Sequence, residues 1–275
     1  MKTDSPNQVA STSDDSLQRF AGIARLYGEG ALQRFRRAHV AIIGIGGVGS
    51  WAAESLARSG IGEFTLVDLD DLCITNINRQ IHALDQSVGQ PKSRVMADRI
   101  VSINPTCRVH SKDCFFSERT IEDILHPEAT PLDAVIDAID VFGPKSLLLA
   151  GCRERSLPVF SCGAAGGRTD PSMIQTADLS LTYRDALLNQ VRRKLRSDYG
   201  FPKGEKPKKS FGITAIFSPE QAVFPHPDGC VSIERPENLP PGLRCDAGYG
   251  SATHVTATFG LFAAAEVLKL LASGD

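Results

Sequence analysis

Two carboxylates follow an apolar segment and stand close enough together to serve one ligand. Asp68 and Asp70 are separated by one residue, so both side chains can face the same side of an extended chain. A magnesium ion in a nucleotide site is typically held by one or two carboxylates together with phosphate oxygens. The pair therefore suits the metal complex of a triphosphate.

Amide and basic side chains follow. Residues 76–80 read Asn-Ile-Asn-Arg-Gln, with Asn76, Arg79 and Gln80 as candidate ligand-binding residues, and Lys92 ends a Gly-Gln-Pro-Lys segment. Arg79 offers a fork of donors to phosphate oxygens, and Lys92 offers a point charge. Taken singly, these residues are equally typical of surface cations and turns, so the prediction depends on their combination.

A glycine-rich loop precedes this polar set. Gly44, Gly46 and Gly49 satisfy the pattern G-x-G-x-x-G between an apolar strand and a helix, and Gly47 adds a further small residue. Such a loop brings phosphates close to the free N–H groups of a helix N-terminus. Asp68 would end the next strand, where it can accept hydrogen bonds from ribose hydroxyls. A nucleotide site is predicted, with a merely tight strand–helix turn as the alternative.

A later strand ends in Asp137-Ala-Ile-Asp140, and the whole set, in this order over residues 19–165, resembles the ubiquitin-activating-like adenylating superfamily. The resemblance implies that Asp68 binds the ATP ribose, that Arg79 and Lys92 bind its phosphates, and that Asp140 holds magnesium. It also implies attack of a carboxylate on the α-phosphate. An arginine, a lysine and a metal are the groups that neutralise the charge developing in such a reaction.

Further segments are similar to one bacterial branch of that superfamily, the tRNA threonylcarbamoyladenosine dehydratases. The segments are residues 25–29, 46–54, 78–84, 163–171, 194–200 and 245–260. The resemblance implies adenylation of the threonyl carboxylate of the modified adenosine in tRNA and closure to a cyclic oxazolone. It further implies a homodimer and links the family with a cysteine-desulfurase and sulfur-acceptor pair. The alternatives are an enzyme that adenylates a sulfur-carrier or ubiquitin-like protein, and an NAD-binding oxidoreductase.

Basic residues are concentrated between positions 192 and 209 of a chain whose net charge is −2. A local cationic surface of this kind can contact the phosphates of a polyanion such as tRNA. The alternative is that the segment is a loop whose charges only keep the protein soluble. The candidate tRNA-binding residues are Arg192, Arg193, Lys194, Arg196, Lys203, Lys206, Lys208 and Lys209.

Three further assignments are less constrained by the residues. The superfamily often supplies an N-terminal arginine to the partner subunit's ATP site, and Arg25 or Arg19 is the candidate here. Cys245 is a candidate nucleophile, although a free cysteine is more often a small buried side chain and intramolecular cyclisation requires no covalent relay. The glycines at 163–167 could present carbonyl groups to a monovalent cation, or simply form sharp turns.

Composition indicates an ordinary globular protein with no overall bias toward nucleic acid or membrane: 275 residues, 42% of them hydrophobic. The seven cysteines include no Cys-x-x-Cys pair, so no paired-cysteine zinc site is expected. Their odd number and the absence of a signal peptide favour a reducing cytoplasm. Residues 1–16 are polar and are expected to form a disordered leader.

Alternating apolar and helical segments must position these residues. Strands are predicted at 40–43, 64–68, 107–112, 133–140 and 157–162, with helices at 48–59, 93–103, 117–126, 144–155 and 184–197. This alternation predicts an α/β, Rossmann-like, doubly wound and mostly parallel sheet. From about residue 170 we expect a substrate-binding elaboration of the same single domain, 17–275, with antiparallel strands at 211–217 and 221–224. The apolar segment 254–271 is interrupted by Glu266 and Lys269 and is predicted to be a buried helix rather than a membrane span.

Overall fold

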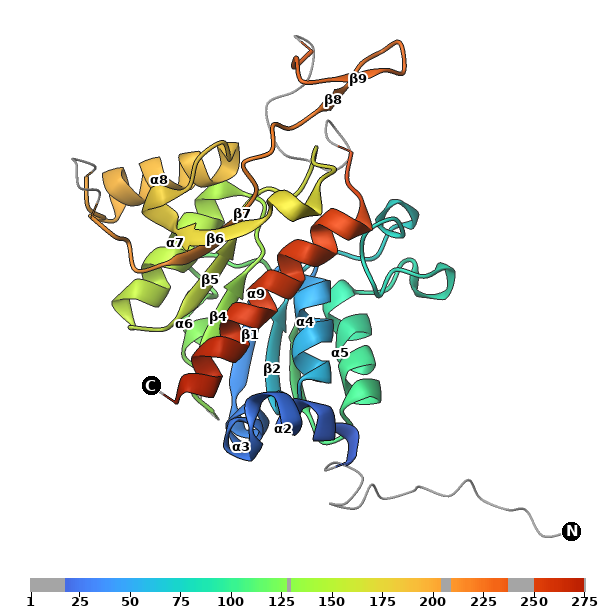
Figure 1. The fold of residues 1–275 in the computed structure, drawn as a ribbon, viewed down its shortest axis with the longest axis vertical. Coiled ribbons are helices and arrows are strands. Elements are labelled where there is room, and N and C mark those ends of the chain that lie inside the picture. The colour runs from blue at the N-terminus through green and yellow to red at the C-terminus, as the bar shows by residue number, and fades with distance from the viewer. Residues whose placement is uncertain (1–17, 128–129, 204–208, 237–249, 275) are drawn as a thin grey trace, which may run out of the picture.

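The computed structural model describes residues 18–127, 130–203, 209–236 and 250–274, which form a seven-stranded sheet covered by helices (Figure 1). The strands are ordered β3–β2–β1–β4–β5–β7–β6, and every neighbouring pair is parallel except β6 and β7. Their bounds are β1 His39–Ile43, β2 Glu63–Val67, β3 Arg108–Lys112, β4 Ala134–Asp137, β5 Val159–Cys162, β6 Gln175–Asp178 and β7 Thr214–Phe217. The predicted fold class is confirmed.

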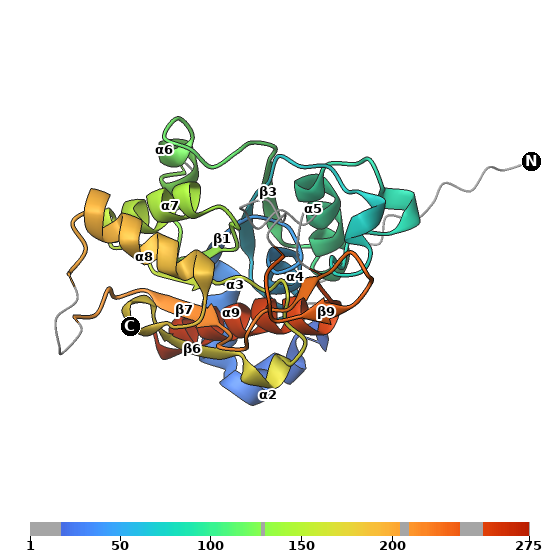
Figure 2. The same cartoon turned by 90° about the horizontal axis from the view of Figure 1, so that it is seen from above.

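Helices cover both faces of the sheet, with α7 and α8 on the side opposite α9 (Figure 2). The α-helices are α2 Ala21–Tyr27, α3 Glu29–Arg37, α4 Gly49–Arg58, α5 Lys92–Ile103, α6 Ile121–Leu125, α7 Phe142–Glu154, α8 Ala186–Asp198 and α9 Thr253–Ser273. Short 3₁₀ helices are η1 Ile74–Asn76, η2 Asp85–Ser87, η3 Pro171–Met173 and η4 Leu179–Leu181. The two faces enclose separate apolar cores. One core lies under α3, α4, α5 and α9, and the other under α6, α7 and α8.

The central strands explain why the sequence contains uninterrupted apolar segments. Every residue of β1 and β2 is buried, as expected for parallel strands covered on both faces. Ile43, the last residue of β1, pairs with Val67 of β2 and Asp137 of β4. The carboxyl ends of three strands therefore coincide, which brings the loops that follow them to one edge of the sheet.

The C-terminal part refines one prediction. Short antiparallel strands were expected at 211–217 and 221–224, and β7 in the first of these ranges is antiparallel to β6 but also extends the main sheet, parallel to β5. Strand β6 was not expected, because this polar strand at the edge of the sheet has no apolar repeat. A separate small sheet pairs β8 (Phe224–Pro225) with β9 (Val231–Ser232).

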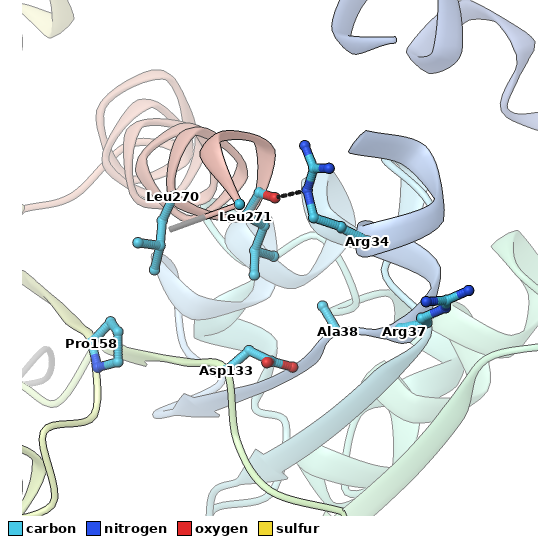
Figure 3. A pocket seen from close by; sticks show the side chains of 8 residues that line it. Arg34, Arg37, Ala38, Asp133, Pro158, Leu270 and Leu271 are labelled. Carbon is cyan, nitrogen blue, oxygen red and sulfur yellow. Dashed lines mark hydrogen bonds between the residues drawn. The ribbon is translucent and has the colours of Figure 1, made fainter. Parts of the chain in front are cut away.

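Helix α9 has a mean hydropathy of 1.6 and, by length and composition, could cross a membrane, but half of its apolar window is buried in the protein. It packs on α4 and α3 and crosses the sheet at β5 and β7. Its last carbonyl groups are capped by Arg34, whose Nε donates to Leu271 O at 2.8 Å (Figure 3). This arrangement is the buried helix that the sequence predicted. The predicted leader, residues 1–16, lies outside the described residues.

Candidate active site

A pocket of about 940 Å³ lies beyond the carboxyl ends of the parallel strands. This edge is where doubly wound sheets bind their ligands. The pocket collects most residues of the predicted nucleotide site: Gly44, Gly46, Gly47, Asp68, Asp70, Asn76, Arg79, Gln80, Lys92 and Asp140. Gly49 does not line it but begins α4 directly behind the loop.

The loop requires glycine at two positions. Gly44 has a φ of 95°, and a Cβ added there would lie 2.8 Å from Ala138 O. At Gly49 an added Cβ would lie 1.8 Å from Gly44 O, so any side chain would force the loop away from the helix. Together these glycines let the backbone turn from β1 into α4 and present the start of the helix to the pocket, as phosphate binding requires.

Asp68 stabilises the loop in addition to lining the pocket. Its Oδ2 accepts a hydrogen bond from Ile45 N at 2.6 Å, and its Oδ1 accepts one from Asp70 N at 2.9 Å. Burial raises the pKa of the Asp68 carboxyl, while nearby Lys92 acts in the opposite direction. Each oxygen retains a lone pair for a second donor, so the carboxylate can also accept hydrogen bonds from ribose hydroxyls.

Lys92 and Asp70 form an ion pair at the pocket wall. Lys92 Nζ lies 2.8 Å from Asp70 Oδ2, and the lysine side chain is 9% exposed whereas that of Asp70 is 63% exposed. In this structure the carboxylate of Asp70 is therefore engaged with a cation. Lys92 is held at the pocket by this contact and by its place in the first turn of α5.

Arg79 is almost completely buried and is held from several sides. Its Nη1 donates to Thr75 O at 2.7 Å and to Asn78 Oδ1 at 3.1 Å. Its carbonyl oxygen accepts a hydrogen bond from Trp51 Nε1 at 3.0 Å. The guanidinium is thus oriented at the pocket wall before any ligand binds. This orientation would lower the entropic cost of binding phosphate oxygens.

The two predicted amides differ in their local roles. Asn76 Oδ1 accepts a hydrogen bond from Cys73 N at 3.1 Å, so this side chain shapes the turn at η1. Gln80 is 4% exposed, and its Oε1 has no hydrogen-bond partner among the described residues. A buried polar atom without a partner is costly in a native structure and is most often found where a ligand or water binds.

Asp140 lies in the turn between β4 and α7 and faces the solvent at the pocket. Beneath it, Asp137 and Lys145 are fully buried and form an ion pair with Nζ and Oδ2 2.8 Å apart. Lys145 Nζ also donates to Ile139 O at 3.0 Å. This buried pair fixes the turn from below and leaves the carboxylate of Asp140 directed outward.

Sequence reasoning missed part of the pocket wall. Cys114, Phe115 and Phe116 follow β3 and line the pocket, and Phe115 is 66% exposed. Gly250 and Ser251 close the wall from the start of the C-terminal segment. The position of residues 114–116 could have indicated this, because they follow a parallel strand. Loops that follow parallel strands meet at one edge of the sheet.

The glycine cluster lines the same pocket through residues 163–166. Asp185 Oδ2 accepts a hydrogen bond from Ala164 N at 3.0 Å, and Arg168 donates to Ala164 O. These contacts fix the backbone of the cluster at the wall of the pocket.

Two of the three described cysteines that line the pocket are poor nucleophile candidates. Cys73, Cys114 and Cys162 line it. Burial raises the pKa of the Cys114 thiol and raises that of Cys162 to about 12, which keeps both protonated near neutral pH. Cys245 lies outside the described residues.

The candidate tRNA-binding residues that the structure describes do not line the pocket. Arg192, Arg193, Lys194 and Arg196 lie on α8. Lys194 forms an ion pair with Asp198 at 2.5 Å, and the guanidinium of Arg196 stacks 5.1 Å from the ring centroid of Phe211. Lys203 and Lys209 follow the helix, and Lys206 and Lys208 lie outside the described residues.

Both candidate trans-acting arginines lie at the end of the molecule opposite the pocket. Helices α2 and α3 precede β1 at its amino end (Figure 1). Arg25 is exposed in the last turn of α2, and Arg19 donates from Nη1 to Ile103 O at 3.0 Å. Neither residue lines the pocket of its own chain.

Comparisons with known proteins place the chain in a family. The ThiF family model matches residues 18–275. The chain is 48% identical to the tRNA threonylcarbamoyladenosine dehydratase of Escherichia coli K12, with 94% of each chain covered. A crystal structure of the E. coli tRNA N6-threonylcarbamoyladenosine dehydratase in complex with ATP is 44% identical, has a TM-score of 0.82 and covers 97% of this chain and 98% of that one.

A more distant relative is the molybdopterin-synthase adenylyltransferase of E. coli K12. It is 30% identical over 57% of this chain and 62% of its own length. The sulfur-carrier adenylating enzymes therefore match only at the level of the superfamily. The chain belongs to the ThiF family and, within it, to the tRNA threonylcarbamoyladenosine dehydratases.

Proposed function

We propose that the protein uses ATP to dehydrate threonylcarbamoyladenosine in tRNA to its cyclic oxazolone. The main support for this proposal is that the glycine loop, Asp68, Arg79 and Lys92 line one pocket at the carboxyl edge of the sheet. Relatives that match nearly the whole chain are tRNA threonylcarbamoyladenosine dehydratases, and the structure of one of them contains ATP.

The reaction has two steps that balance without a further reagent. A threonyl carboxylate oxygen attacks the α-phosphorus of ATP, and the bond to pyrophosphate breaks. The carbamoyl oxygen then attacks the activated carbonyl carbon, AMP leaves with the original carboxylate oxygen, and the carbamoyl group loses a proton. Because carboxylate and nucleophile belong to the same nucleoside, neither a thioester relay nor a catalytic role for Cys245 is required.

The residues of the pocket supply charge and orientation for this reaction. Arg79 and Lys92 offset the negative charge that develops on the phosphates, and Asp68 orients the ribose. The start of α4 behind the glycine loop adds backbone N–H groups. Gln80 adds a buried acceptor, its Oε1 atom, which has no hydrogen-bond partner among the described residues.

Magnesium fits the donor set at Asp140. Its carboxylate is exposed at the pocket, and the described part of the chain offers it no ion-pair or hydrogen-bond partner. Asp140 would hold the ion there, and the ion would supply positive charge that neutralises the phosphates of ATP. Asp70 is less suited to this role, since Lys92 already engages it.

The tRNA would reach the pocket from the side of the glycine cluster and the wall at Gly250 and Ser251. Leu187, in the first turn of α8, also lines the pocket, so the basic residues farther along that helix would contact phosphates outside it.

A homodimer would bring Arg25 or Arg19 of one subunit to the other's ATP. We also propose a monovalent cation at the glycine carbonyls, a cysteine-desulfurase and sulfur-acceptor pair as partners, and a cytoplasmic location.

The deciding experiment is ATP–pyrophosphate exchange with defined substrates. Exchange should require tRNA that carries the threonylcarbamoyl group. Equal exchange with tRNA lacking that group would refute the proposal, and exchange driven by a peptide ending in Gly-Gly would favour a carrier-protein substrate. Preferential binding of NAD over ATP with magnesium would favour the oxidoreductase alternative.

A second test uses cells. Nucleosides are prepared under mild conditions from tRNA of a strain lacking the gene and are analysed by mass spectrometry. The proposal expects loss of the cyclic nucleoside with the open form retained. Unchanged cyclic nucleoside would contradict it.

A further inference from the structure

We infer that Asn78 is a positioning residue that joins the phosphate-binding arginine to the opposite wall of the pocket. This inference rests on the proposed function and goes beyond it, because Asn78 was not among the predicted site residues. Asn78 lines the pocket between Asn76 and Arg79 and is exposed to solvent.

The carboxamide of Asn78 makes one hydrogen bond toward each side. Its Oδ1 accepts from Arg79 Nη1 at 3.1 Å, and its Nδ2 donates to Ser251 O at 2.8 Å. A guanidinium only donates and a backbone carbonyl only accepts, so these two partners fix the orientation of the amide. No other orientation satisfies both contacts.

A further contact attaches the same residue to the start of α9. Thr253 Oγ1 donates to the backbone carbonyl of Asn78 at 2.5 Å. Thr256 Oγ1, one turn along the helix, lies 3.4 Å from Arg79 O. Segments more than 170 residues apart in the sequence are thus held together at the turn that carries Arg79.

The wall that Asn78 contacts continues toward the substrate side. Gly250 O accepts a hydrogen bond from Gly167 N, and Gly167 O accepts one from Val223 N, both at 2.8 Å. Residues 163–166, immediately before Gly167, line the pocket, as do Gly250 and Ser251. Asn78 therefore lies where the nucleotide half and the substrate half of the pocket meet.

Two separable consequences follow. Through Oδ1, Asn78 restricts the guanidinium of Arg79 to an orientation that faces the phosphates. Through Nδ2 and the backbone contact, it fixes residues 250–253, against which the modified nucleoside would bind. Loss of the side chain should therefore weaken both ATP binding and the use of tRNA.

The test compares N78A, N78Q, T253V and the control T258V. Thr258 lies on the same helix, but among the described residues its hydroxyl donates only to His254 O one turn earlier, at 2.7 Å. Each full-length variant is assayed for its ATP dissociation constant by calorimetry without tRNA, and for kcat and KM with threonylcarbamoylated tRNA. Thermal unfolding is recorded for all four.

N78A should raise both the ATP dissociation constant and the KM for modified tRNA by about fivefold to tenfold, the loss expected for one hydrogen bond on each side. N78Q keeps the amide and should restore both values to within about threefold of wild type, since an exposed position lets the longer side chain adjust. T253V should raise only the KM for tRNA, by about threefold, and T258V should change neither.

Two results would overturn the inference. One is an N78A enzyme whose ATP affinity and tRNA KM both stay within twofold of wild type. The other is a variant that loses only kcat together with thermal stability, as a purely structural residue would. If the wild type fails to convert modified tRNA, the proposed function fails, whereas the ATP affinities of N78A and N78Q still decide the link to Arg79.

Discussion

The two ends of the parallel sheet carry similar charged and polar residues. The ends differ in how far these side chains are bonded to other parts of the protein. At the carboxyl ends, charged and amide side chains face a pocket of about 940 Å³. At the amino ends, Arg34, Arg37 and Asp133 line a smaller pocket of about 310 Å³ (Figure 3). Beside it lie the buried side chains of His39 and Glu63 together with the exposed side chain of His110.

The amino-end group resembles a metal site by composition, because its three candidate ligand atoms lie within 4.8 Å of one another. Each of these side chains is already bonded. Glu63 accepts from Arg108 and from His110 Nε2, while His39 Nδ1 and Nε2 each lie 2.9 Å from Thr130 O and Thr65 Oγ1, respectively. Arg34 is likewise engaged, since it caps α9. We therefore assign this end a structural role.

The carboxyl end differs because backbone geometry leaves groups without partners there. Loops leave the strands at this edge, and α4 begins with N–H groups that its own helix cannot satisfy. Asp140 and Gln80 add side-chain atoms that no described residue engages. The comparison teaches that residue type alone does not mark a site. A buried polar atom without a partner beside an open pocket, such as Gln80 Oε1 among the described residues, is the stronger indication.

The largest expected effect is a difference in enzyme activity between a substitution at the carboxyl end and one at the amino end. Lys92→Met should lower kcat/KM for tRNA-dependent ATP–pyrophosphate exchange by roughly 10²- to 10³-fold, because a charge that stabilises the transferring phosphate is removed. The matched amino-end variant, Arg37→Met, should stay within about twofold of wild type. Equal losses in the two variants would remove the distinction.

A smaller effect concerns stability and its pH dependence at the amino end. Burial would raise the pKa of Glu63, but hydrogen bonds from Arg108 and His110 outweigh it and lower the pKa from 4.5 to about 2. Since the folded pKa is below the unfolded one, ionised Glu63 stabilises the protein above about pH 4.5, and this contribution is lost as the pH falls toward 2.

Glu63→Gln should accordingly lower the free energy of unfolding by on the order of 2 kcal/mol at neutral pH and by much less near the folded pKa. Urea unfolding at several pH values measures this difference. At neutral pH the variant should keep its kcat with saturating ATP. A selective loss of kcat would assign the group to catalysis rather than to structure.

The smallest effect concerns the helix cap shown in Figure 3. Arg34→Met keeps much of the apolar stem but removes the donors to the last carbonyl groups of α9. It should cost about 1 kcal/mol of unfolding free energy, as the loss of a favourable charge at a helix C-terminus does. Thermal denaturation tests this, and the ATP dissociation constant should not change. A weakened ATP affinity would mean that the two ends are coupled through α9.

Local patterns predicted much of the fold and of the nucleotide half. Gly44 and Gly49 were identifiable because their turn tolerates no side chain, and the strands through residue 162 because their apolar segments are short and bounded. Strand β6 escaped prediction because an edge strand with polar residues carries no burial pattern. The ion pair of Asp70 with Lys92, which lies 22 residues away in the sequence, was not expected.

The amino-acid sequence determined a doubly wound sheet with a nucleotide loop at its carboxyl edge, since helix and strand periodicities and glycine tolerance are local properties. The pairing of charged groups depended on the folded chain. Lys92 with Asp70, Lys145 with Asp137 and Asn78 with Ser251 meet only when distant segments pack. Short-range spacing identifies a group that is able to bind phosphate, whereas three-dimensional packing determines whether a neighbour has already satisfied it.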